Sequence, residues 1–513
     1  MKNEIQKLVD LINRLDLRIL LFAVIFLATF SIRLSDNEEE YFVFAKAFAD
    51  PHWIPGALSI KDVPGTRIIF DTVVGWALGF ASFEQIAAAG RMLCAMFFAF
   101  PLSLLFKKLR LSHIEAVFLL TAFVVSHQSF FGNEWIFRSF ETKVVSYAFV
   151  FYSIYHLIEE RFRLSVIFAA AAIYFHVLVG GWYVLALFAY LLLRRLPFRE
   201  VLISALTLAL LLSPLAFYLA GKYLVHNPNV IDGVTVSWVY AYVRNPHHLA
   251  VMAKLLHGDS AVRIEVALSA FMGWLCIKTW AKDKDPAIRA LCLLSLILFA
   301  QQFFSLLTAV FDTQGVFLKF YPYRTSALSL FLNLTLLLLL LKKSGWLHRL
   351  ESRSSAEASN GRGGQWAVVS VMLAFVVLGL CSRLYRNGVD SYRVAYPSVK
   401  QSAMNSASDW IRLNTDPAAV VLDLEDRTAG HLQFIRKTQR DSFSVYKFVP
   451  TTNALIYEWY QRVLARDLLV KDISALPAIK SKYRIDYILS ERPLSGEALK
   501  PVYQNEFFHL YAV

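Results

Sequence analysis

The sequence predicts an all-α polytopic membrane protein that ends in a small α/β domain. Of its 513 residues, 57% are hydrophobic and only 18% are charged, a balance that excludes an ordinary soluble globular protein. Apolar runs of membrane-spanning length recur from residue 17 to residue 385 and then stop. The many aromatic residues, 41 Phe, 23 Tyr and 11 Trp, suit helices that face lipid and its interfaces.

The net charge of +13 does not indicate a nucleic-acid partner. The basic residues form short clusters between apolar runs and do not gather on one domain, so they are better read as signals of membrane topology. The four cysteines, Cys94, Cys276, Cys292 and Cys381, lie in apolar segments without metal-type spacing. We therefore expect neither a zinc site nor a disulfide framework.

The apolar runs predict about eleven membrane helices. We place them at residues 17–32, 86–106, 113–130, 143–158, 164–180, 181–193, 200–221, 263–280, 287–311, 325–341 and 366–385. Residues 66–83 are also apolar but include Arg67 and Asp71, and we place them as an interfacial helix inside an outer loop, 34–85. That choice puts every later basic cluster on the side of the N-terminus, as the positive-inside rule requires of the cytoplasmic side.

Leu164–Leu193 is too long for one ordinary span and short for two. Reading it as one helix would place all later Lys and Arg clusters outside, so we expect two short helices that reverse at Gly180-Gly181. His176 lies in this segment and, without further information, is most simply a hydrogen-bonded core histidine.

Residues 387–513 lack membrane-length apolar runs. Helix-like stretches at 402–413 and 454–468 alternate there with β-like stretches at 419–424, 485–490 and 507–513, which predicts a small soluble domain. The chain thus divides into a transmembrane domain, 1–386, and a C-terminal domain, 387–513. An odd number of spans puts the second domain outside, on the same side as the acidic outer loop, with the N-terminus in the cytoplasm; in a bacterial inner membrane, which the resemblance described below implies, this side is the periplasm.

The outer loop begins with a dense acidic run, Ser35-Asp36-Asn37-Glu38-Glu39-Glu40-Tyr41. Crowded carboxylates repel one another and favour a bound proton or cation. The run is also what a solvated helix start requires, with Asp36 or Asn37 as the N-cap and glutamates favoured by the helix dipole. Both interpretations remain open from the residues alone.

Other outer loops hold acids and bases close together. Those that we single out are Glu134, Arg138, Glu141, Lys143, Arg244, His247, His248 and Arg324. Carboxylates can deprotonate an acceptor hydroxyl or hold a divalent cation against a phosphate, and Arg and Lys neutralise phosphate charge. Arg324 can equally be a snorkelling interfacial arginine, and the two histidines a plain surface pair. Glu141 and Lys143 do not face each other on a helix, so we expect them to bind different partners.

The order of these features resembles the GT-C superfamily of integral-membrane glycosyltransferases, which take sugars from polyprenyl-phosphate or polyprenyl-diphosphate donors on the non-cytoplasmic face. The matching residues are Glu38-Glu39-Glu40-Tyr41, Val63-Pro64-Gly65, Ala87–Arg91 and the basic end Lys107-Lys108. Asn37 departs from the pattern, because it stands where the family usually has its catalytic Asp. The Trp-Trp-Asp-Tyr-Gly run of oligosaccharyltransferases is missing from the sequence, so transfer to asparagine is not expected.

The resemblance implies an inverting glycosyltransferase in a bacterial inner membrane, using a polyprenyl-phosphate-linked sugar to modify a glycan, lipid or protein. Glu38, Asp36 and Glu39 would be the catalytic carboxylates, with Glu38 or Asp36 as the general base. Arg324, Arg138, Lys143 and Arg244 would bind the donor phosphate, and Glu141 with Glu134 would hold a divalent cation such as Mg²⁺ or Mn²⁺. The alternative is a GT-C-like protein without catalysis, a transporter or scaffold in polysaccharide assembly; the scarcity of mid-span charges favours the enzyme.

Overall fold

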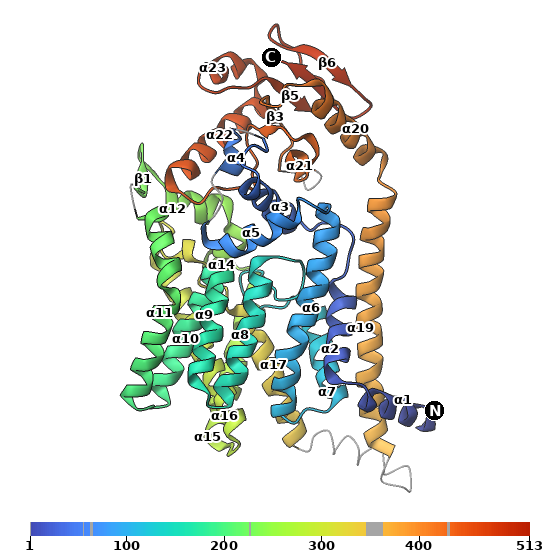
Figure 1. Cartoon of the computed structure of the whole chain (residues 1–513), viewed down its shortest axis with the longest axis vertical. Helices are drawn as coiled ribbons and strands as arrows, with labels where there is room; N and C mark the ends of the chain where they lie inside the picture. The colour runs from blue at the N-terminus through green and yellow to red at the C-terminus, as the bar shows by residue number, and fades with distance from the viewer. Residues whose placement is uncertain (1, 55, 62–64, 225–226, 345–362, 428–430) are drawn as a thin grey trace. The chain divides into compact units, whose positions relative to one another are not determined.

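The computed structural model describes residues 2–54, 56–61, 65–224, 227–344, 363–427 and 431–513 (Figure 1). The chain forms two compact units. Unit 1 comprises Met1–Ser31, Ala88–Pro214 and Pro246–Gly388, and unit 2 comprises Ile32–Ala87, Leu215–Asn245 and Val389–Val513. Each unit joins segments that are far apart in the sequence, so the outer loop 34–85 folds together with the C-terminal segment.

The described residues contain an apolar helix at each of the eleven predicted positions, wholly or mostly within unit 1. They are α2 (Leu17–Thr29), α6 (Phe83–Lys108), α7 (His113–Val125), α8 (Thr142–Ile158), α9 (Phe162–Phe175), α10 (Val177–Leu193), α11 (Phe198–Tyr223), α15 (Ser260–Lys282), α16 (Pro286–Phe311), α17 (Ser326–Lys343) and α19 (Gly363–Ala395). Six of them, α6, α11, α15, α16, α17 and α19, are long and apolar enough to cross a membrane. The predicted polytopic helical architecture is confirmed. Shorter elements of this unit are α1 (Lys2–Arg14), α13 (Pro246–Leu249), α14 (Val251–Leu256) and η3 (Leu318–Phe320).

Ion pairs tie the predicted basic loops together at one end of the unit 1 bundle. They join Lys108 to Glu159, Arg194 to Glu160, Arg163 to Glu200, Lys342 to Glu115 and Lys343 to Asp283. His113 of the same end contacts the Ile12 carbonyl, which brings α1 to this end as well. The basic clusters therefore do lie on the side of the N-terminus, as the sequence pattern indicates.

The reversal inside Leu164–Leu193 occurs at His176 and not at the glycines. Helix α9 ends at Phe175, His176 is extended, and its imidazole accepts a hydrogen bond from the Val179 N–H as the N-cap of α10. Gly180 instead lets the two helices approach, since a Cβ there would lie 2.5 Å from the Ile173 nitrogen. The expected turn at Gly180-Gly181 was wrong because a histidine side chain supplied the cap.

In unit 2 the outer loop forms α3 (Asp36–Ala49), α4 (Leu58–Lys61), η1 (Gly65–Arg67) and α5 (Ile68–Ala77). The helix expected at 66–83 is thus shorter, and α6 begins at Phe83. Helix α5 packs directly on α3, because Gly75 has no Cβ and a Cβ there would lie 2.3 Å from the Ala45 carbonyl oxygen. This close approach fixes the acidic start of α3 relative to Arg67.

The C-terminal segment contains a five-stranded mixed sheet in the order β4-β3-β5-β7-β6. Strands β3 (Val420–Asp423), β4 (Asp441–Ser442) and β5 (Tyr487–Ser490) are parallel, whereas β6 (Lys500–Gln504) and β7 (His509–Ala512) pair antiparallel. The other elements of this segment are α20 (Val399–Asn414), α21 (Phe434–Thr438), α22 (Asn453–Lys471), η5 (Ile473–Ala475) and α23 (Leu476–Lys480). The predicted α/β character is confirmed.

The core of unit 2 unites the outer loop and the sheet. Val43, Phe44 and Ile60 pack in one buried cluster with Val421 and Leu489. A second cluster joins α22 to the loop between α11 and α13, which forms β1 (Val230–Ile231), β2 (Val234–Thr235), α12 (Val236–Trp238) and η2 (Val239–Arg244). Segments separated by some 400 residues thus share one hydrophobic core.

Candidate functional site

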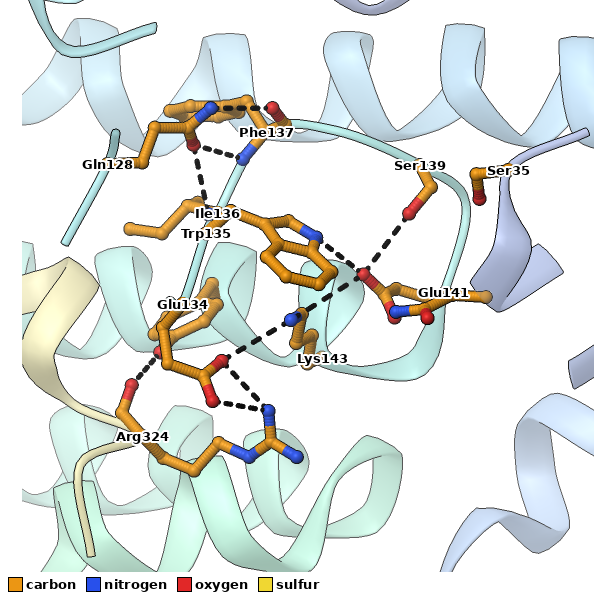
Figure 2. Close-up of polar contacts among 12 residues, drawn as sticks. Ser35, Gln128, Glu134, Trp135, Ile136, Phe137, Ser139, Glu141, Lys143 and Arg324 are labelled. Carbon is orange, nitrogen blue, oxygen red and sulfur yellow. Dashed lines mark hydrogen bonds and ion pairs between the residues drawn. The ribbon is translucent and has the colours of Figure 1, made fainter. Parts of the chain in front are cut away.

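The loop between α7 and α8 is held rigidly in unit 1. The Gln128 side chain accepts from the N–H groups of Ile136 and Phe137 at 3.0 and 2.8 Å and donates to the Phe137 carbonyl at 2.9 Å (Figure 2). The N–H groups of Phe130 and Phe131 both donate to Ser326 Oγ at the start of α17. These hydrogen bonds satisfy backbone groups of a loop that has no regular secondary structure, and they fix the loop backbone that carries the charged side chains.

Glu134 is the centre of a buried ionic cluster. Arg324 Nη1 lies 2.7 and 2.8 Å from its two carboxylate oxygens, and Lys143 Nζ lies 3.3 Å from one of them (Figure 2). Burial alone would raise the pKa of Glu134, but the charges of Arg324 and Lys143 outweigh it and lower the pKa to about 2. Glu134 is therefore ionised at neutral pH and is the shared counter-ion of Arg324 and Lys143.

Glu141 and Lys143 are paired, contrary to the expectation from helical spacing. Lys143 Nζ lies 3.8 Å from Glu141 Oε1, and the Trp135 indole and the Ser139 hydroxyl donate to the same oxygen at 2.8 and 3.1 Å (Figure 2). The expectation failed because Glu141 is the extended N-cap of α8, not a helical residue. Lys143 also lies 3.2 Å from the centroid of the Trp135 ring, a cation–π contact.

The predicted metal ligands do not fit a divalent cation. Glu134 is neutralised by Arg324 and Lys143, and Glu141 accepts from Trp135 and Ser139. Across the described ranges, no group of three or more His, Cys, Asp or Glu side chains is arranged to hold a metal ion. The Nδ1 of His248 is already engaged, since it contacts the Gly132 carbonyl at 2.5 Å.

In unit 2 the acidic run is the first turn of α3, and its N-cap is Ser35 rather than Asp36 or Asn37. Glu38, fully buried, completes a capping box: its carboxylate accepts from the Ser35 N–H at 2.8 Å, and Ser35 Oγ accepts from the Glu38 N–H at 3.2 Å. Asp36 is exposed. Of the predicted catalytic acids, Asp36 is the most accessible and Glu38 the most enclosed.

Glu39 is engaged by an arginine far along the chain. Arg436 donates from Nε and Nη2 to the two carboxylate oxygens at 2.8 and 2.7 Å, and its Nη1 lies 3.0 Å from Glu84. This bidentate pair fastens α3 to α21 and to the start of α6 within unit 2. Asn37, in turn, accepts from Lys447 Nζ at 2.8 Å.

Arg67 and Asp71 form a buried pair that was not predicted as a site. Arg67 Nε lies 3.9 Å from Asp71 Oδ2, and its guanidinium carbon lies 4.3 Å from the centroid of Tyr41. Among the described residues, Nε and Nη2 of Arg67 and both oxygens of Asp71 are buried without a hydrogen-bond partner. Burial raises the pKa of Asp71 to about 7, against the opposing pull of Arg67.

The remaining predicted phosphate ligands are separate from these groups. Arg138 is exposed, with its guanidinium 4.8 Å from the Trp135 centroid in unit 1. Arg244, in unit 2, donates to the Lys447 carbonyl at 2.9 Å. Arg324, Lys143 and Glu134 therefore belong together, whereas Arg244 does not belong to their unit.

Two crystal structures of ArnT from Cupriavidus metallidurans, one bound to undecaprenyl phosphate and one in the apo state, resemble this chain. Each comparison covers 96% of this chain and 96% of the ArnT chain at 12% sequence identity, with TM-scores of 0.50 and 0.48. No protein-family model and no curated protein matches the sequence. ArnT is a GT-C glycosyltransferase.

The chain has a GT-C fold. The expectation drawn from Glu38–Tyr41 and from the basic end of α6 is thereby confirmed for the architecture. Within this GT-C fold the catalytic and phosphate-binding roles of individual residues remain predictions. Arg67 was noted among the polar residues of the outer loop but was not among the predicted phosphate ligands; its position after Pro64-Gly65 in an apolar stretch was the available signal.

Proposed function

We propose that the chain is a membrane glycosyltransferase that transfers a sugar from a polyprenyl-phosphate-linked donor to a glycan, lipid or protein acceptor on the periplasmic face. The GT-C fold supports the proposal, because ArnT, crystallised with undecaprenyl phosphate, shares it along nearly the whole chain. Six helices are long and apolar enough to cross a membrane, and a protein embedded in this way meets a polyprenyl tail within the bilayer.

Arg67 carries the proposal within this chain. Burial of Nε and Nη2 of Arg67 without partners costs about 1–3 kcal/mol for each group, and a bound anion that accepts from them would remove this cost. A phosphate accepts two parallel N–H groups in the bidentate geometry that a guanidinium offers. Tyr41 and Phe44 hold the guanidinium over their ring faces, with its carbon 4.3 and 5.0 Å from the ring centroids, and so preset its position.

The acids at the start of α3 are the candidate bases. In the proposed step, Asp36 or Glu38 takes the proton of an acceptor hydroxyl while the hydroxyl oxygen attacks the anomeric carbon. The bond from that carbon to the phosphate oxygen breaks, and the polyprenyl phosphate leaves with the electron pair, its negative charge stabilised by Arg67. A single displacement of this kind inverts the anomeric configuration. Glu39 is a positioning residue here, since both its oxygens accept from Arg436.

Arg324 and Lys143, with the exposed Arg138, form a second set of cations that can bind the donor phosphate. Glu134 and Glu141 balance two of these three charges, so the set offers a preformed but largely neutralised surface. No step of the proposal uses a divalent cation.

The first experiment measures binding of undecaprenyl phosphate to the purified full chain by native mass spectrometry. We expect Arg67→Gln to weaken binding about tenfold or more and the exposed Arg161→Gln to leave it unchanged. Loss in Arg324→Gln or Arg138→Gln, with Arg67→Gln unaffected, would assign the phosphate to unit 1. Equal binding by all variants, or none by the wild type, contradicts the proposal.

The second experiment tests catalysis in cells. Asp36→Asn and Glu38→Gln should abolish one glycan modification of the cell envelope at unchanged protein levels. Glu38→Gln is a fair test, because Gln at this position preserves the capping box. Wild-type glycans in the double variant would end the assignment of these acids as bases.

A second candidate is a GT-C-like protein without catalysis, serving as a transporter or scaffold in polysaccharide assembly. Asn37 favours it, because an amide cannot take a proton and its oxygen is bonded to Lys447. The two candidates differ in one measurement. Only the enzyme releases polyprenyl phosphate when the purified chain is incubated with a lipid-linked sugar fraction and an acceptor extract.

A further inference from the structure

An open cavity of about 250 Å³ lies along α19 in unit 1, where Val125 at the end of α7 meets that helix. Its lining is apolar along one stretch, with Val125, Phe375, Leu378 and Gly379, and cationic along the next, with Arg383 and Arg386 beside Ser382. The volume exceeds the roughly 30 Å³ share of one water several times over. A cavity with an apolar and a cationic part suits an amphipathic anion.

The two arginines of this cavity lie near a third cation, Arg138. Within the described part of the chain, no carboxylate forms an ion pair with Arg383, Arg386 or Arg138, and the charges of Arg386 and Arg138 both act on Arg383. Three like charges in one neighbourhood repel, and an anion placed among them relieves that repulsion.

Arg383 is fixed at the cavity by α7. Its guanidinium donates from Nη2 to the carbonyl of Val124, in the last turn of that helix. Gly379 brings the helices together, since a Cβ there would lie 3.0 Å from Thr121 Cγ2 and 3.1 Å from Val125 Cγ1. The position of Arg383 is thus set by the packing of two helices, whereas Arg386 is exposed.

The depth of the arginines matches the level of lipid headgroups. Arg383 and Arg386 follow Ala367, where the apolar span of α19 starts, by roughly 24 and 28 Å of helix at about 1.5 Å per residue. The hydrocarbon core of a bilayer is about 30 Å thick. Arg383 contacts Val124 at the C-terminal end of α7, whereas Glu115 at the other end of α7 pairs with Lys342 of the basic loops. The cavity therefore lies at the end of the bundle away from the basic loops.

We propose that this cavity binds the phosphate headgroup of a membrane lipid, with Arg383 and Arg386 on the phosphate and the first part of the hydrocarbon tail along Phe375 and Leu378. The site goes beyond the proposed function and does not depend on it, because it shares no residue with Arg67 or with the α3 acids. A plain helix cap accounts for the bond from Arg383 to Val124, but not for Arg386 or for the apolar extension of the cavity.

The test is native mass spectrometry of the full chain, purified in detergent and titrated with dioleoyl phosphatidic acid or dioleoyl phosphatidylcholine. We expect the wild type to retain one phosphatidic acid at least tenfold more tightly than phosphatidylcholine. Arg383→Gln/Arg386→Gln should lose this preference, as should Ser382→Trp, which fills the cavity while both arginines remain. Arg393→Gln, on the same helix but outside the cavity lining, should bind like the wild type.

Several results would overturn the proposal. They are equal retention by the double variant, equal retention of both lipids by the wild type, and unchanged binding in Ser382→Trp at an unchanged melting temperature. If Arg383→Gln alone unfolds the chain, Arg386→Gln and Ser382→Trp decide the question. Arg67→Gln separates this site from the proposed function, because it should lose undecaprenyl phosphate at the donor site and still retain phosphatidic acid here.

Discussion

The carboxylate of Glu134 should be worth several kcal/mol to unit 1. Replacing it by Gln leaves Arg324 and Lys143 buried without their common counter-ion, and removing one partner of a buried pair typically costs about 3–5 kcal/mol. The pKa gives a second route to the magnitude. Its lowering from 4.5 to about 2 corresponds to roughly 3 kcal/mol. Both figures are of the same order.

The assay is thermal unfolding of the detergent-solubilised chain, followed by tryptophan fluorescence. For a cooperative unit of about 300 residues, a loss of 3 kcal/mol lowers the apparent melting temperature by about 5 °C. The matched control is Glu160→Gln. Glu160 forms an ion pair with Arg194 at 2.8 Å, but both side chains are solvent-exposed, so we expect this substitution to lower the free energy of unfolding by less than about 1 kcal/mol. A double-mutant cycle with Arg324→Gln should show that the two losses are not additive.

The pH dependence of this effect has a definite sign. Because the pKa of Glu134 is lowered on folding, its contribution is fully present above about pH 4.5 and is lost as the pH falls toward 2. The advantage of the wild type over Glu134→Gln should therefore be constant from pH 7 to pH 5 and shrink below that. A variant within 1 kcal/mol of the wild type at pH 7, or an advantage that grows on acidification, refutes the reasoning.

Three further predictions concern other parts of the molecule. Gly180→Ala should destabilise by about 1–3 kcal/mol, because its Cβ would overlap Ile173, whereas Gly181→Ala, with nothing within 4 Å, should be neutral or slightly stabilising; equal melting temperatures would refute the hairpin geometry. Asp71→Asn should be more stable than the wild type at pH 8, with the difference vanishing toward pH 4. Its folded pKa is raised to about 7, so the wild type loses stability as the pH rises to that value; a difference independent of pH contradicts this. A reporter fused after Val513 should be active only outside the cytoplasm, and a strong cytoplasmic signal would reverse the topology derived from the basic loops.

The helices were predictable from the sequence because their signals are local. A run such as 200–221 is recognised as a membrane helix from its hydropathy alone. The basic clusters that indicate the orientation of the spans lie next to those spans in the sequence. The reversal within Leu164–Leu193 was placed only approximately, at Gly180-Gly181, because glycine is the commoner helix terminator and the capping bond of His176 leaves no trace in the composition.

The partners of the charged residues were not predictable. Arg436 meets Glu39 across 397 positions, and Arg324 meets Glu134 across 190. Nothing in a single sequence pairs one arginine with one glutamate over such distances. The sequence could place these residues in outer loops, but the choice between a phosphate ligand and the counter-ion of a carboxylate required coordinates.

The hydrogen-bond partners of the acidic run at the start of α3 change its interpretation. Glu38 is bonded to Ser35 and Glu39 to Arg436, so the mutual repulsion that suggested a bound proton or cation is already relieved by the fold. Asp36 is the exposed acid among the three predicted catalytic residues, and of the two bases in our proposal it is the more accessible. The unsatisfied charged groups of the outer loop are instead Arg67 and Asp71: Nε and Nη2 of Arg67 and both carboxylate oxygens of Asp71 are buried without a hydrogen-bond partner among the described residues. A phosphate bound by Arg67 would add a negative charge near Asp71 and favour its protonated form, so donor binding should be coupled to proton uptake close to neutral pH.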